Sequence, residues 1–225
     1  MAELKEPETA SEKLAAFIER SKKVLIPLLI VLICILIGYI ITSGVLTNGK
    51  AKDLQTLDEI TYTLTSKSSS LEDSEVELRR QNAIEQAAAY TMKGGIVGAR
   101  ANILCADLTF QQKKYEESAE YWKNAADKGK KTYIAPIAYY NLAVCYEELN
   151  RSDDAAVNYK LAADNKDFVL CSHAMFSYAR VLDSQSKYEE ASEAYKQLID
   201  KFPENEWAYL AKSRIIALQN AGKIE

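Results

Sequence analysis

Few side chains in this chain could do chemistry, and they do not form a recognisable catalytic set. His173 is the only histidine, and the sequence contains no HExxH, CxxC or glycine-rich phosphate loop. The adjacent carboxylates Glu116-Glu117 and Glu189-Glu190 are each predicted in the first turn of a helix, where negative charge favours the helix dipole. The sequence therefore predicts no enzyme, no cofactor or metal, and no small-molecule substrate.

The cysteines are the other reactive side chains. Cys105, Cys145 and Cys171 occupy mostly apolar positions of predicted helices, which is typical of buried free thiols. Cys105 and Cys145 are expected on neighbouring helices, so a disulfide remains an alternative that requires a Cα separation of about 5.5 Å.

The elements that position these residues repeat along the sequence. A small residue, then an aromatic four positions on, then an apolar residue seven positions on, recurs at intervals of 37 and 36 positions. Spacings of four and seven lie on one helix face. The three copies are Ser118, Trp122, Ala125; Ala155, Tyr159, Ala162; and Ala191, Tyr195, Leu198.

A matching helix is expected upstream of each copy. It carries the pair Cys105-Ala106, Leu142-Ala143 or Tyr178-Ala179, thirteen and twelve positions before the small residue of its copy. This pattern resembles the tetratricopeptide repeat over roughly residues 96 to 203. It departs from that family at Thr109, where an aromatic residue is usual. Its repeats are also slightly longer than the family's usual length of about 34 residues.

The composition indicates an all-α fold, and the resemblance implies a right-handed, tetratricopeptide-like solenoid of helix pairs. One transmembrane helix is expected to precede it. Gly (8) and Pro (4) are few, and the sequence shows no alternating β-branched run. The net charge of −4, without a long basic block, argues against nucleic-acid binding.

An uncharged segment runs from Val24 to Ile41 and, at about 1.5 Å per residue, is long enough to cross a bilayer. Pro27 is expected in its first turn. A cleaved signal peptide is the alternative, but no small-residue cleavage site follows. A lipoprotein based on Cys34 fits less well, because apolar residues continue on both sides.

The charges that flank this segment predict its orientation. Lys13, Arg20, Lys22 and Lys23 precede it, whereas only Lys50 and Lys52 follow closely. The positive-inside rule then places the N-terminus in the cytoplasm and the repeats outside it, in the periplasm of a bacterium.

The expected organisation has five parts. Residues 1–23 are a cytoplasmic segment in which Thr9-Ala-Ser-Glu12 forms a capping box for a short amphipathic helix. Residues 24–42 are the transmembrane helix. Residues 43–95 contain a turn at Gly44 and Asn48-Gly49, then a degenerate helix pair whose second helix is capped by Ser70 and stopped by Gly94-Gly95. Residues 96–203 are three repeats. Residues 204–225 are a capping helix that uses Trp207, Leu210, Ala211, Ile215 and Leu218.

This arrangement resembles the YfgM family, the membrane-anchored periplasmic ancillary subunits of the bacterial Sec translocon. The resemblance implies protein partners: translocon subunits, exported polypeptides or periplasmic chaperones, at the inner membrane. The ending Phe202-Pro203-Glu-Asn-Glu-Trp207 is also similar to the BamD and YbgF repeat proteins, which leaves a structural envelope scaffold as the alternative.

The repeat register predicts a concave protein-binding wall from first-helix positions outside the packing stripe. Of the Lys/Asn/Arg clamp that binds C-terminal carboxylates in some members of the repeat family, only Asn141 matches. The predicted wall consists of Arg100, Ile103, Asp107, Phe110, Ile137, Tyr140, Asn141, Val144, Glu147, His173, Phe176, Arg180 and Asp183.

Overall fold

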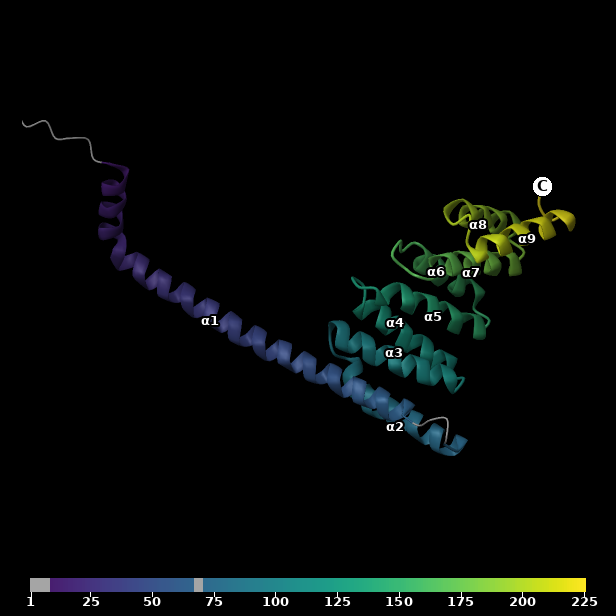
Figure 1. Cartoon of the computed structure of the whole chain (residues 1–225), viewed down its shortest axis with the longest axis horizontal. Helices are drawn as coiled ribbons and strands as arrows, with labels where there is room; N and C mark the ends of the chain where they lie inside the picture. Colours follow the sequence, from purple (N-terminus) through teal and green to yellow (C-terminus); the bar gives the residue numbers. More distant parts are fainter. Residues whose placement is uncertain (1–8, 67–70) are drawn as a thin grey trace, which may run out of the picture. The chain divides into compact units, whose positions relative to one another are not determined.

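The computed structural model describes residues 9–66 and 71–225, and throughout these ranges the regular structure is α-helical. The chain divides into two compact units, one up to Lys52 and one from Asp53 to Glu225. In the second unit the helices follow one another as stacked antiparallel neighbours, from teal to yellow in Figure 1. This is the predicted all-α solenoid.

Helix α1 runs from Ala10 to Thr65, much longer than the sequence predicted. The capping box is confirmed, since the Thr9 amide donates to the Glu12 carboxylate at 2.8 Å and the Glu12 amide donates to Thr9 Oγ1. Because the helix begins there, Pro27 lies in its interior and not in a first turn, so that prediction was wrong.

The predicted turn at Gly44 and Asn48-Gly49 was also wrong, because these residues lie inside α1. A glycine costs a helix only about 1 kcal/mol relative to alanine, and the flanking segments are both strongly helical. Within the described residues, Ile26–Thr65 is the one stretch of helix long and apolar enough to be a candidate membrane span, and its most apolar part is unburied.

The predicted degenerate pair forms from the end of α1 and from α2 (Asp73–Thr91). Leu57 and Ile60 of α1 pack against Ala83, Ile84 and Ala87 of α2. The predicted cap Ser70 lies outside the described residues, and Glu72 is the N-cap of α2, which begins at Asp73. The predicted stop is confirmed, because α2 ends just before Gly94, which is the N-cap of α3.

Three helix pairs follow, and in each we call the members the first and second helix. The first helices are α3 (Gly95–Gln111), α5 (Ile134–Glu148) and α7 (Cys171–Ser184), and the second helices are α4 (Tyr115–Lys128), α6 (Ser152–Ala163) and α8 (Tyr188–Lys201). The predicted stripe residues of the second helices are all buried, as are Ala106, Ala143 and Ala179 of the first helices. Side chains no larger than a methyl group at these positions let each pair approach closely. Cys105, Cys145 and Cys171 are buried free thiols, as expected.

Each first helix ends in the same turn. Lys113, Asn150 and Ser186 adopt positive φ of 60°, 56° and 60°. The amide three residues past each helix end donates to the carbonyl five residues earlier, as from Lys114 to Thr109 at 2.9 Å. These are Schellman motifs with a left-handed residue that is not glycine.

Helix α9 (Glu206–Asn220) packs on α8 and α7. It buries Ala208, Ala211 and Leu218, whereas Leu210 is 48% exposed, so the predicted covering role of Leu210 was wrong. The helix ends at Gly222 with φ +64° and with the same pair of Schellman bonds as α3, α5 and α7. Because Gly222 follows Ser186 by 36 positions, α9 occupies the register of a first helix.

Candidate functional site: the first-helix wall

The predicted wall residues lie on α3, α5 and α7 as expected from the register, but their environments differ. Asp107 and Arg180 are exposed, Asp183 is buried, and the remaining ten are half-buried. Several of these side chains contact a residue of the neighbouring first helix, which lies about one repeat away in the sequence.

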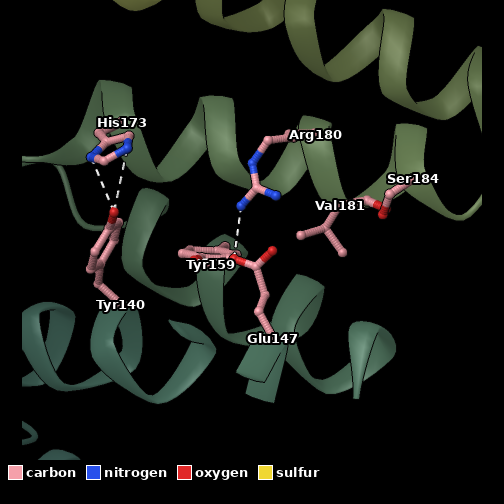
Figure 2. Close-up of polar contacts among 7 residues, drawn as sticks. All are labelled: Tyr140, Glu147, Tyr159, His173, Arg180, Val181 and Ser184. Carbon is pink, nitrogen blue, oxygen red and sulfur yellow. Dashed lines mark hydrogen bonds and ion pairs between the residues drawn. The ribbon is translucent and has the colours of Figure 1, made fainter. Parts of the chain in front are cut away.

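The best-defined contact joins α5, α7 and α9 through aromatic rings. The Tyr140 hydroxyl hydrogen-bonds the ring of His173, 3.0 Å from Nδ1 (Figure 2). The other side of this histidine is covered by Trp207, whose ring stacks on it with a centroid distance of 3.8 Å. Burial and the nearby Arg180 lower the pKa of His173, so the imidazole is neutral at pH 7. The histidine is thus part of an inter-repeat packing contact.

A second contact joins α5, α6 and α7 through ions. Glu147 accepts a hydrogen bond from the Tyr159 hydroxyl at 2.6 Å and pairs with the Arg180 guanidinium at 2.7 Å (Figure 2). The hydrogen bond and charge of Glu147 raise the pKa of Arg180, while burial and the same carboxylate raise the pKa of Tyr159. Both neighbours keep their protons at neutral pH, so the geometry is fixed by charge-assisted bonds.

The ends of the wall make similar contacts. Asp183 pairs with Arg214 of α9, and Arg100 pairs with Asp58 of α1 at 2.5 Å. The Phe176 ring lies 5.3 Å from Trp207 and 5.5 Å from Tyr195.

The remaining positions lie closer to the core or to solvent. Ile103, Phe110, Ile137 and Val144 are packed at the edges of the buried clusters, and the Asn141 amide donates to the Ile137 carbonyl of its own helix. Partial removal from water raises the pKa of Asp107 to about 6, although the residue as a whole remains exposed.

The register also identifies wall positions that the sequence analysis missed. The four α7 positions His173, Phe176, Arg180 and Asp183 recur 36 residues later on α9. The equivalents are Tyr209, Lys212, Ile216 and Gln219, all of which are exposed. The signal was available, because Gly222 continues the spacing of the three helix ends, but the last helix was assigned only a covering role.

This arrangement suits binding more than chemical catalysis. Across the described ranges, no group of three or more His, Cys, Asp or Glu is placed to hold a metal ion. Glu116-Glu117 and Glu189-Glu190 lie in the first turns of α4 and α8, as predicted. The wall instead presents aromatic, aliphatic and charged side chains of both signs.

Models of the tetratricopeptide repeat match residues 106–169 and 173–205. A TPR repeat-containing protein of Treponema pallidum (strain Nichols) is 33% identical over 139 residues, which are 62% of this chain and 58% of that protein. The chain thus spans less than two thirds of the length of this relative. A solved structure, the apo form of RapI, matches this chain with 17% sequence identity and a TM-score of 0.48. The match covers 61% of this chain and 53% of the RapI chain.

The family matches begin inside α3 and extend through α8, and they support a tetratricopeptide-repeat protein. Repeats of this kind are modules for protein–protein interaction, and stacked repeats form extended concave binding surfaces. The matches therefore support a role in protein–protein interaction.

Proposed function

We propose that this chain is a membrane-anchored, periplasmic adaptor at the Sec translocon. In this proposal the first-helix wall binds exported chains as they emerge, or links them to periplasmic chaperones, as the resemblance to the YfgM family implies. The N-terminus is cytoplasmic, and the repeat domain lies outside the inner membrane.

The observation that carries the proposal is the composition of α1. One helix contains both the unburied apolar stretch and, shortly after it, Leu57 and Ile60 of the repeat-domain core. Few residues separate a membrane anchor from the first helix pair, so the tether gives the repeat domain a high effective concentration near the membrane. The excess of Lys and Arg before the apolar stretch supports the orientation.

The chemistry of the wall supports a polypeptide partner. Half-buried aromatic rings lie beside the Glu147–Arg180 ion pair on α5 and α7, which offers both apolar contacts and hydrogen bonds. Chains of varied sequence can use such a surface because no single side chain determines binding.

A structural envelope scaffold is the second candidate, and one observation favours it. Tyr140 is already bonded to His173, and Glu147 to Arg180, so this part of the wall is ordered without a partner. A preordered surface suits a folded partner, since little side-chain entropy is lost on docking.

Site-specific photocrosslinking in cells tests the proposal. A crosslinking residue replaces Asp107 or Arg180, which are exposed on the wall, and the matched control replaces Leu161, which is 43% exposed on the second helix α6. We expect wall-specific adducts to translocon subunits or newly exported chains.

A variant of this chain separates the two candidate functions. In this variant, residues 1–42 are replaced by a cleavable signal, which releases the repeat domain from the membrane. Loss of the adducts supports the translocon function. A single folded partner that is retained without the anchor would support the scaffold and contradict the translocon proposal.

A further inference from the structure

An apolar pocket lies at one end of the first helices α5 and α7. It encloses about 310 Å³, at the small end of the range for ligand pockets. Tyr133, Pro136 and Ile137 line it from the start of α5, and Phe168, Val169 and Leu170 line it from the segment between α6 and α7.

Large apolar side chains at the pocket mouth are unusually exposed. Val169 is 92% exposed, Tyr133 is 70% exposed and Leu170 is 45% exposed. Phe168 is buried and forms the floor, where it packs with Cys171 and Ala174. A fixed floor beneath exposed apolar walls is typical of an interaction site and not of loose loop residues.

The charge around the pocket is mostly positive. Exposed Lys130 and Lys131 precede Tyr133 by three and two positions, and exposed Lys166 lies between the lining residues Asn165 and Asp167. Tyr133 and Leu170 are the N-caps of α5 and α7, so the positive ends of two helix dipoles meet here.

Acidic groups offset this charge only in part. The first turns of α5 and α7 contain no acidic residue, whereas those of α4, α6 and α8 each contain two. Asp167 lines the pocket, and Asp164 is the C-cap of α6 nearby. The pocket therefore combines apolar walls with two helix N-termini and with lysines that are close to its lining residues in the chain.

We propose that this pocket binds one bulky apolar side chain from an acidic segment of a partner protein. The apolar walls accept the side chain, and the lysines and helix N-termini attract the flanking carboxylates. A membrane surface fits less well, because the feature is concave and a carboxylate, that of Asp167, lies on its lining. The pocket adjoins the wall, because Ile137 belongs to both and because the ring centroids of Phe168 and Tyr140 lie 6.2 Å apart. The proposed binding nevertheless requires neither the membrane anchor nor the translocon.

A peptide display library tests this proposal on the full chain in phosphatidylcholine nanodiscs. Every peptide carries one Trp, Phe or Leu between random flanks, and selected peptides are sequenced. Val169→Asp places a charge at the mouth, and its matched control is Val157→Asp, since Val157 is 58% exposed on α6 away from the pocket. The charge test compares Lys130→Glu/Lys131→Glu with Lys123→Glu/Lys196→Glu on exposed positions of α4 and α8.

We expect Asp and Glu to be enriched in the flanks on the parent chain. Binding of the selected peptides should fall about tenfold with either pocket variant and remain unchanged with either control, a loss equivalent to about 1.4 kcal/mol. Unchanged circular dichroism and melting temperature show that Val169→Asp still folds. Absent enrichment, basic or neutral flanks, or binding that survives Val169→Asp would each overturn the proposal.

A photocrosslinker at Val169 distinguishes a lipid occupant. It is used in nanodiscs that contain phosphatidylglycerol, with a selected acidic peptide present. A peptide adduct supports the proposal, and an adduct to phosphatidylglycerol instead of the peptide overturns it.

Discussion

Replacing the left-handed residue at the end of a first helix with glycine is expected to stabilise the repeat domain. Lys113 and Ser186 have φ of 60°, a conformation in which a side chain crowds the following carbonyl oxygen. Glycine removes this crowding and leaves both Schellman bonds intact, because they use only backbone atoms. Gly222 already occupies the same position after α9.

The magnitude follows from two opposing terms. The left-handed conformation costs an L-residue about 1–2 kcal/mol. Glycine gives back about 0.4–1 kcal/mol, because it increases the conformational entropy of the unfolded chain. Lys113→Gly and Ser186→Gly should therefore each raise the free energy of unfolding by about 0.5–1 kcal/mol, and their effects should add, since they lie in different repeats. For a domain of this size, 1 kcal/mol corresponds to about 2–4 °C in melting temperature.

Thermal unfolding of the full chain in detergent micelles, followed by circular dichroism, measures the effect. Asn150→Gly should change the melting temperature little, because asparagine tolerates the left-handed conformation. Lys114→Gly is the matched control: φ of Lys114 is −88°, so glycine there should lower stability. A lower melting temperature for both Lys113→Gly and Ser186→Gly would refute the assignment of these turns.

Three further outcomes are expected. Ala143→Leu places a large side chain where Ala143 is fully buried, and urea unfolding should show a loss of about 1–3 kcal/mol, whereas Ala217→Leu on the exposed side of α9 should cost much less. The pKa of Asp107, raised from 3.8 to about 6, favours its protonated form in the folded state, so this contribution to stability is present below pH 4 and is lost as pH rises through 6. Asp107→Asn should remove that pH dependence in urea unfolding, and an unchanged pH profile would contradict the shift. A reporter active only outside the cytoplasm should be active when fused after Glu225 and inactive before Met1, and the reverse pattern would place the repeats in the cytoplasm.

The repeat core could be predicted from the sequence because it depends on local spacing. A small residue, an aromatic and an apolar residue at intervals of four and three can share only one helix face, and three copies fix the register. Trp122, Tyr159 and Tyr195 are accordingly buried. The failed predictions at Pro27, Gly44 and Asn48-Gly49 concern helix ends, where proline, glycine and asparagine are only weak signals. Gly44 and Gly49 lie inside α1 because neighbouring segments propagate the helix through them.

The wall could be predicted only as a set of positions. The register placed all thirteen residues on the first helices, but it contained no information about pairs such as Tyr140 with His173, which depend on how far one helix is displaced along the next. The pocket at the start of α5 was missed for a different reason. Tyr133 and Val169 belong to loops of unequal length that lie outside the repeat pattern, so no periodicity connects them.

The wall is not uniform, and this constrains how it can recognise a partner. At its centre, Glu147 already accepts bonds from Tyr159 and Arg180, so a partner gains little from that carboxylate unless it displaces an existing charge-assisted bond. At the α9 end, Tyr209 and Ile216 offer exposed apolar area, and the Tyr209 hydroxyl donates to the nearby Glu204 of its own chain segment. If the wall binds a partner as proposed, the binding energy should therefore come mainly from apolar contacts at its α9 end, while the paired centre holds α5 and α7 in place relative to each other.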